Sequence, residues 1–199
     1  ARMMVEGFKM NLLYFDLRPN QELEALVRDY GRLLAQHGEP EPQVRRVESL
    51  DDLLEGSDVV SLHTALDDGT RHLIDAKRLD RMKRDAILIN TSRGPVIDEA
   101  ALVAHCREHP DFRVGLDVFE EEPAMKPGLA ELDNVTVVPH IASASVWTRE
   151  GMATLAAANV AAILQGRPLW RGDDVGPFLE GSVPPYAPSI VNAEALGLE

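Results

Sequence analysis

Short, continuously apolar runs recur along the chain, and longer segments with mixed polar and apolar residues separate them. Apolar runs of about four to eight residues are typical of strands that are buried on both faces, as in parallel sheets. The pattern therefore predicts five strands, at residues 11–16, 58–63, 86–92, 112–117 and 135–140.

The segments between these runs place leucine, valine and alanine at the spacing of an amphipathic helix. Asp98 stands where it can cap one of these segments. Because strands and helices alternate, we expect an α/β fold with a Rossmann-like, doubly wound parallel sheet. The predicted crossover helices are residues 21–38, 50–57, 75–85 and 98–109.

The pattern changes after residue 145. Residues 146–166 form a long Ala-rich segment that predicts a helix ending at Gly166, and residues 167–192 are rich in Pro and Gly and predict an extended tail. We therefore divide the chain into residues 1–145 and residues 146–199, and we expect the tail to lie along another domain.

Composition and charge exclude several classes of partner. With 199 residues, 45% hydrophobic and 27% charged, the chain suits one soluble domain, or one such domain plus an appendage. A net charge of −13 repels nucleic-acid phosphates, and no apolar stretch is long enough to span a bilayer. We predict no nucleic-acid or membrane partner. The single cysteine, Cys106, can form neither an internal disulfide nor a cysteine-based metal cage.

Hydrogen-bonding or ionisable residues stand at the carboxyl end of all five predicted strands. Ligands of open parallel sheets bind beyond these ends, where loops and helix N-termini converge. Any one of the residues could be an ordinary strand end, but their joint occurrence predicts a ligand site. They are Asp16, His63, Asn90 to Arg93, Asp117 and His140.

Asp16 has a specific interpretation. In dinucleotide-binding folds an acidic residue at the end of the second strand binds the adenosine ribose, about 20 residues after a Gly-rich turn. Counting back places that turn at or before Ala1, so we expect it, and the first strand, upstream of this sequence. A surface turn at residues 16–20 is the alternative. Arg18 can accommodate a 2′-phosphate whereas Asp16 disfavours one, so NAD is the expected cofactor and NADP the alternative.

Arg93 and His140 have side chains suited to keto-acid chemistry. A guanidinium in a Gly-containing loop can bind a carboxylate in bidentate fashion, and an exposed ion pair is its alternative role. His140, after Pro139, can exchange a proton near neutral pH. The remaining helix-associated histidines are interpreted as solvated or structural, and no metal site is predicted; they are His37, His72, His105 and His109.

Three motifs, in this order, resemble those of the D-isomer-specific 2-hydroxyacid dehydrogenases. They are INTSRGPVIDEAAL at residues 89–102, GLDVFEEEP at 115–123 and VVPHIASAS at 137–145. The resemblance implies that Arg93 binds the substrate, that Glu122 and His140 are the catalytic pair, and that Asp117 approaches the nicotinamide. We expect the neighbouring Glu120 and Glu121 to belong to a solvated turn. It also implies cofactor contacts from His63, Thr64, Thr91 and Ser143. The proline that many relatives carry after this His63 is absent, which weakens the expectation at Thr64.

Residues 119–129, 143–157 and 188–198 further resemble the hydroxypyruvate reductases (glycerate dehydrogenases) of plant peroxisomes. This similarity implies NADH-dependent reduction of hydroxypyruvate to D-glycerate by a homodimer, with the tail belonging to the substrate domain. It implies a peroxisomal location, with the cytoplasm as the alternative. Reduction of glyoxylate or another 2-keto acid is the closest alternative activity. A binding module of the NAD(H)-responsive corepressor type is an alternative outside catalysis.

Overall fold

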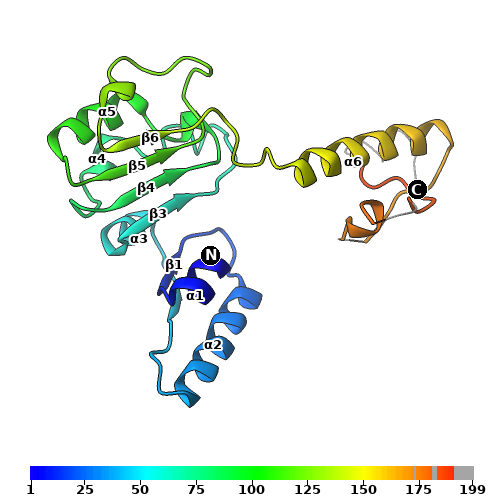
Figure 1. Ribbon diagram of the computed structural model, residues 1–199, viewed down its shortest axis with the longest axis horizontal. Coiled ribbons are helices and arrows are strands. Elements are labelled where there is room, and N and C mark those ends of the chain that lie inside the picture. Colours follow the sequence, from blue (N-terminus) through cyan, green and yellow to red (C-terminus); the bar gives the residue numbers. More distant parts are fainter. Residues whose placement is uncertain (173, 181–182, 191–199) are drawn as a thin grey trace. The chain divides into compact units, whose positions relative to one another are not determined.

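The computed structural model describes residues 1–172, 174–180 and 183–190. The chain divides into two compact units, one from Ala1 to Pro139 and the other from His140 onward. The first unit consists of parallel sheets flanked by helices (Figure 1), which confirms the predicted α/β class.

Six parallel strands form two sheets in the first unit. The smaller sheet pairs β1 (Leu12–Tyr14) with β2 (Val44–Arg46). The larger sheet has the order β3 (Val59–Leu62), β4 (Ile87–Asn90), β5 (Arg113–Leu116) and β6 (Val135–Val137). In this sheet Leu62 pairs with Asn90, Asn90 with Leu116, and Leu116 with Val137, so the carboxyl ends of the strands are aligned.

All five predicted strands are present, but the sixth, β2, was not predicted. Its sequence is Val-Arg-Arg, and Arg45 is exposed. None of its three residues is buried, so the strand does not need an apolar run. The predicted helix at 75–85 is also shorter than expected, because α4 (Ala76–Leu79) ends at Asp80 and the polar residues that follow form turns.

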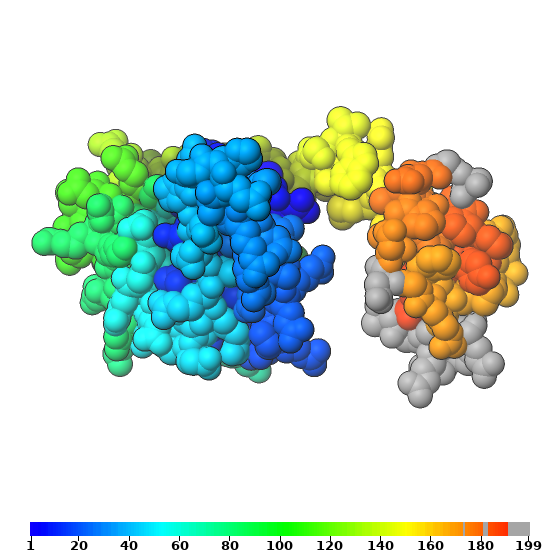
Figure 2. Space-filling model, turned by 90° about the horizontal axis from the view of Figure 1, so that it is seen from below, coloured from blue at the N-terminus to red at the C-terminus, as the bar shows by residue number. Residues whose placement is uncertain are grey.

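The helices begin where side-chain caps allow. The Asp98 carboxylate accepts the N–H of Ala101 at 3.0 Å, as predicted, at the start of α5 (Glu99–Glu108). Asn20 and Ser49 cap α2 (Gln21–Gln36) and α3 (Leu50–Gly56) in the same way. By contrast, α1 (Arg2–Phe8) has no side-chain cap. In Figure 2, α2 lies in blue on the surface of the first unit.

The core of the first unit lies between the four-stranded sheet and its helices. Leu88 of β4, Leu102 of α5 and Phe112 before β5 are fully buried. Each such side chain contributes about 1.5–3 kcal/mol relative to its exposed state. Asn134, before β6, donates its side-chain amide to the carbonyl oxygens of Cys106, His109 and Phe112 at 2.8–3.1 Å. The C-terminal end of α5 is thereby fixed to the start of β6.

In the second unit, the long helix α6 (Val146–Leu164) begins at a cap formed by Ser145. Gly166 follows it with a φ of 62°, a left-handed conformation that suits glycine, as predicted for the helix end. Trp170 packs edge-on against Phe178, which belongs to η3 (Gly176–Phe178), and against Tyr186. Among the described residues, no helix combines the length and the apolar character that crossing a bilayer requires.

Candidate functional site

A pocket of about 550 Å³ opens at the carboxyl ends of β3 and β4. Two strand-end loops line it, residues 63–66 after β3 and residues 91–93 after β4. The lining therefore brings together four residues that the sequence singled out, His63, Thr64, Thr91 and Arg93.

Buried Asn90, the last residue of β4, holds the second of these loops in shape. Its Oδ1 accepts the N–H and the hydroxyl of Ser92 at 3.0 and 2.8 Å, and its Nδ2 donates to the carbonyl oxygen of Arg93 at 2.9 Å. These bonds fix the backbone of Arg93, while its side chain is exposed and donates to the Ser92 carbonyl oxygen at 2.6 Å. The guanidinium is thus presented at the pocket from a fixed loop.

Gly94 explains why this loop carries a glycine after the arginine. A Cβ atom at this position would lie 1.8 Å from the carbonyl oxygen of Phe119, a backbone atom of the loop after β5. Because backbone cannot move aside as a flexible side chain can, only glycine fits. Two loops that carry separate motifs are therefore in close backbone contact at Gly94.

Thr64 carries the observation that bears most directly on a bound ligand. Its hydroxyl oxygen is buried and has no hydrogen-bond partner among the described residues, yet the residue lines the pocket. A buried polar atom without a partner costs about 1–3 kcal/mol. A ligand with hydrogen-bonding groups, such as a dinucleotide, would satisfy it, so the pocket fits the expected cofactor. His63 already has a partner, since its Nε2 lies 2.9 Å from the hydroxyl of Ser61.

Asp16 follows β1 and is not among the residues that line this pocket. Its Oδ1 accepts the backbone N–H of Arg18 at 3.2 Å, so the side chain forms the local turn that the sequence offered as an alternative. Arg46 of β2 donates to the Asp16 carbonyl oxygen at 2.9 Å. This second arginine beside Asp16 was not predicted, because it belongs to the strand that the sequence pattern missed.

The loop after β5 is held by a pair of glutamates. Glu99 is buried, and its carboxylate accepts the backbone N–H groups of Glu120 and Lys126, both at 2.7 Å. Glu120 reciprocates by accepting the Glu99 N–H at 3.3 Å, and its other oxygen lies 2.9 Å from His72 Nε2. The side chain of Glu120 is only 14% exposed, so the expectation that it belongs to a solvated turn is wrong. No sequence pattern distinguishes Glu99 from an ordinary acid in a first helical turn, so it was not predicted.

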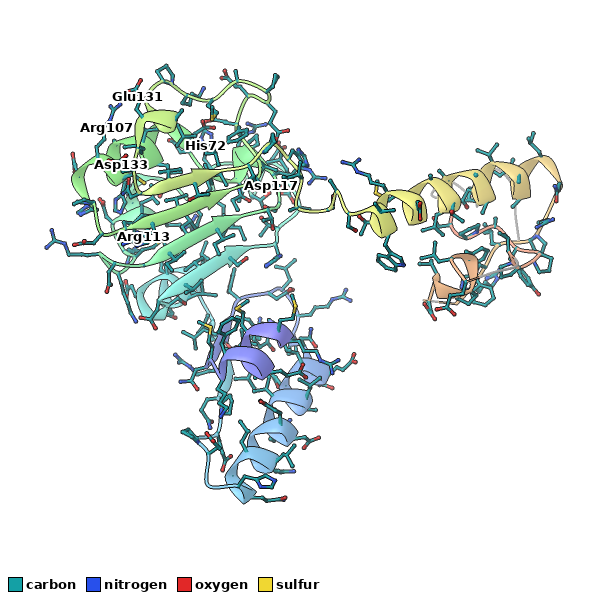
Figure 3. The ribbon with its side chains drawn as sticks, viewed as in Figure 1. His72, Arg107, Arg113, Asp117, Glu131 and Asp133 are labelled. Carbon is teal, nitrogen blue, oxygen red and sulfur yellow. The ribbon has the colours of Figure 1, made fainter. Side chains whose placement is uncertain are left out.

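Asp117 and Glu122 both belong to this loop, Asp117 at its start and Glu122 five residues later. Asp117 is buried and directly follows β5, at the carboxyl end, and Figure 3 shows Arg113 at the opposite end of the strand. Glu122 is exposed, and its Oε1 accepts the N–H of Phe119 at 3.2 Å. Glu121 forms an exposed ion pair with Lys126 at 2.6 Å, as expected for a solvated turn. Glu122 is therefore both accessible and bonded to the backbone of its own loop.

His140 and Ser143 belong to the second unit. His140 has a φ of 54°, in the left-handed region that is uncommon for residues other than glycine, and its side chain is exposed. The carbonyl oxygen of Ser143 accepts a hydrogen bond from the hydroxyl of Thr148 in the first turn of α6. Ser143 is thus anchored to the helix, and its catalytic or cofactor role, like that of His140, stays a prediction.

Comparison with known proteins supplies the family. Residues 1–142 match the profile of the D-isomer specific 2-hydroxyacid dehydrogenase, NAD binding domain. The chain is 60% identical to the glycerate dehydrogenase of Cucumis sativus over 200 residues, which covers 99% of this chain and 52% of that protein. It is also 60% identical to the peroxisomal glycerate dehydrogenase HPR of Arabidopsis thaliana over 201 residues, 100% of this chain and 52% of that protein. The chain therefore spans about half the length of these curated relatives.

Among solved structures, the holo form of D-mandelate dehydrogenase from Rhodotorula graminis superposes with a TM-score of 0.70 at 33% identity. The superposition covers 94% of this chain and 48% of that one. Sequence and structural matches thus agree with the resemblance drawn from the three motifs.

Proposed function

We propose, from the premise that this chain belongs to the D-isomer-specific 2-hydroxyacid dehydrogenase family, that the protein reduces hydroxypyruvate to D-glycerate with NADH. The observation that carries this proposal is the 60% identity to two plant glycerate dehydrogenases over essentially the whole chain. The Arg93 loop and the pocket beside it support the same chemistry, since they offer a cation and an unsatisfied hydroxyl at the carboxyl end of the sheet.

Arg93 binds the substrate carboxylate in this proposal. Its guanidinium can form two parallel hydrogen bonds with a carboxylate, and the Asn90 contacts hold its backbone while the side chain stays accessible. Lysine at this position would keep the charge but lose the planar fork. Arg93→Lys in the full-length protein should therefore raise KM for hydroxypyruvate more than it lowers kcat.

His140 is the proton donor and Glu122 its partner. The developing alkoxide of the substrate needs a proton at its oxygen, which an imidazolium supplies near neutral pH. We assign the Glu122 carboxylate as the ion-pair partner of that imidazolium, and the Phe119 N–H holds the carboxylate in position. When bound, NADH supplies the hydride to the carbonyl carbon.

We propose that Thr64 and Thr91, which line the pocket, contact the cofactor, and that Asp16 binds its adenosine ribose. Further cofactor contacts are assigned to His63, Asp117 and Ser143. Asp16 favours NAD by accepting ribose hydroxyls, whereas Arg18 and Arg46 beside it offer charge for a 2′-phosphate. NAD is the cofactor that this arrangement favours, because the carboxylate would repel a phosphate.

The relatives also guide two wider assignments. The Arabidopsis protein is named as peroxisomal, and we assign the same compartment here, with the cytoplasm as the alternative. We further assign a homodimer to the full-length protein, with a small 2-keto or 2-hydroxy acid as its substrate. Sedimentation velocity on the full-length protein tests the dimer directly.

The decisive experiment measures initial rates on the full-length protein with hydroxypyruvate, glyoxylate and pyruvate, each with NADH and with NADPH. The highest kcat/KM should belong to hydroxypyruvate with NADH. A preference for glyoxylate would keep the reaction class and change the substrate. Absence of turnover with every 2-keto acid, together with NADH binding, would instead favour the corepressor-type module.

The acid–base assignment is tested separately from the substrate. His140→Gln should lower kcat by about 10²–10⁴-fold, the usual contribution of a general acid. Glu122→Gln should move the alkaline limb of the reduction pH profile to lower pH. Glu121→Gln, which removes the exposed neighbouring carboxylate, is the matched control and should leave the limb in place.

A further inference from the structure

A second cluster of ligating side chains lies away from the carboxyl end of the sheet. Asp80, at the C-terminal end of α4, approaches His105 and His109 of α5, and one donor atom from each of the three residues lies within 4.8 Å of the others. His105 Nδ1 is 3.5 Å from Asp80 Oδ1, and the two imidazole rings have centroids 4.3 Å apart. Because His109 comes shortly before β5, the cluster lies toward the amino ends of the strands.

The spacing of the two histidines is the one that suits a shared ligand. Residues four apart lie on the same face of an α-helix, one turn from each other. His105 occupies the last turn of α5 and His109 is its C-cap residue, whose N–H still donates to the His105 carbonyl oxygen at 2.9 Å. Both imidazoles are therefore presented from the C-terminal end of α5, which Asn134 fixes further by binding the His109 carbonyl oxygen.

His109 supplies an independent sign that the cluster lacks a component. Its Nδ1 atom is buried and has no hydrogen-bond partner among the described residues. A ring nitrogen in this state either carries a hydrogen that lacks an acceptor, or is unprotonated and can accept a hydrogen bond or coordinate a metal. A water molecule could also satisfy this nitrogen, but it would not account for the convergence of a second imidazole and a carboxylate.

The chemical types of the three ligands, and the ability of the Asp80 side chain to change rotamer, indicate which metal ion would bind. Two imidazoles with one carboxylate suit Zn²⁺ and similar transition metals, whereas Mg²⁺ and Ca²⁺ prefer oxygen ligands. Donors of a tetrahedral zinc ion lie about 3.4 Å apart, given bonds of about 2.0–2.1 Å. The Asp80 side chain is 73% exposed and can change rotamer to close that difference, while His105 is only 8% exposed and is held edge-on against Phe112.

We propose that Asp80, His105 and His109 form a binding site for one Zn²⁺ ion, which joins the end of α4 to the last turn of α5. A second pocket, of about 310 Å³, adjoins His109 and is lined by Arg84, Glu108, Pro110 and Asp111. Glu108 and Asp111 lower the electrostatic cost of bringing a cation here, and Arg84 opposes them in part. Water or one of these carboxylates completes the coordination.

The role of the ion is structural. It would connect two helices that cover the sheet near the amino ends of its strands, and binding only to the folded state would stabilise it by mass action. The proposal does not depend on the reduction of a keto acid, so failure of one leaves the other standing.

The test is Zn²⁺ binding to the full-length protein after treatment with a chelator, measured by competition with a chromophoric zinc indicator. We expect one equivalent to bind, and His109→Gln and Asp80→Asn each to weaken its affinity at least tenfold. His37→Gln is the control, since it removes an exposed imidazole from the end of α2. Both test positions are at least partly exposed, so neither substitution disturbs the core as a change of buried His105 would.

Two further measurements make the result specific. Co²⁺ in the same site should give the intense visible bands of tetrahedral coordination, and Zn²⁺ should raise the melting temperature of the wild type but not of His109→Gln. Mg²⁺ should do neither. If no equivalent binds, or if His109→Gln and Asp80→Asn bind as tightly as His37→Gln, the proposal is wrong.

Discussion

The two ends of the four-stranded sheet differ in how exposed most of their charged residues are. At the carboxyl end, Asn90, Asp117 and Glu99 are buried, and Asn90 and Glu99 bind loop backbone. At the amino end, most charged pairs are exposed, such as Lys83 with Asp58 at 2.7 Å. Burying polar groups has a desolvation cost that exposed pairs avoid. The carboxyl end bears that cost because the loop after β4 must hold its shape at the pocket, and the loop after β5 packs against it at Gly94.

The difference teaches which residues should matter to which property. Changes at the carboxyl end should reduce activity beyond what their effect on stability explains, because they displace a binding loop. Changes at the amino end should alter stability alone. Substitutions at matched positions of the two ends separate these outcomes.

The largest effect is expected from Gly94→Ala. The added methyl would meet the Phe119 carbonyl oxygen at 1.8 Å, so the Arg93 loop and the loop after β5 must move apart. We expect a loss of about 3 kcal/mol or more in the free energy of unfolding, the upper range for overpacking. Reductase activity of the surviving folded protein should fall at least 100-fold, because small displacements of positioning groups are costly.

Urea unfolding and steady-state kinetics on the full-length protein measure both effects. Gly7→Ala is the matched control, since a Cβ there meets nothing within 4 Å. Wild-type kinetics in a stable Gly94→Ala protein would show that the contact between the two loops is dispensable.

Glu99→Gln should have the next largest effect. The amide keeps the size of the side chain, but one oxygen now has to serve two backbone N–H groups, those of Glu120 and Lys126. Leaving one buried donor unsatisfied costs about 1–3 kcal/mol. Because Glu122 lies in the loop that these bonds hold, kcat should fall about tenfold while KM for NADH changes little.

The first-turn acid of α2 provides the comparison for Glu99. Glu22→Gln removes an exposed carboxylate from the first turn of α2 and should change neither property. If Glu99→Gln lowers stability without lowering kcat, the buried glutamate is a structural residue only.

Asn134→Ala tests the amino end and should be milder. It removes the amide that binds three carbonyl oxygens at the end of α5, so we expect a loss of about 1–2 kcal/mol in the free energy of unfolding. Thermal melts and initial rates together check that activity per folded molecule is unchanged. Asn134→Asp keeps the shape but cannot donate, and should lose as much stability as Asn134→Ala.

Part of the fold and of the candidate site could be predicted from the sequence. Apolar runs located five strands, because strands buried on both faces must be apolar along their whole length. The same rule failed for β2, which contains two arginines. A strand at the edge of a two-stranded sheet can contain such polar residues. Strand-end polarity located His63, Thr91 and Arg93, which the structure gathers around one pocket.

Other features depend on contacts between distant segments, which no local pattern encodes. Glu99 and Glu120 are 21 residues apart and bind each other's backbone, and His72 reaches Glu120 from 48 residues away. The Gly94 contact is equally non-local. Choosing Glu122 over its neighbours likewise required the family resemblance, since three consecutive glutamates have the same local signal.

The smallest effect concerns Cys106, a buried thiol next to His105 in α5. Burial raises its pKa from 9.0 to about 11, because the thiolate loses hydration. In the unfolded chain the thiol ionises at the lower value, so the stability it contributes is complete below pH 9 and is lost as pH rises toward about 11. At pH 10, about one unit above the unfolded pKa, the loss should be about 1.4 kcal/mol.

Urea unfolding at pH 8 and pH 10 measures this loss, and Cys106→Ala isolates the thiol from other groups that titrate in alkali. An identical pH dependence in Cys106→Ala would mean that the thiol ionises as easily in the folded protein as in the unfolded chain. Burial would then affect its ionisation no more than it affects the exposed ion pairs nearby.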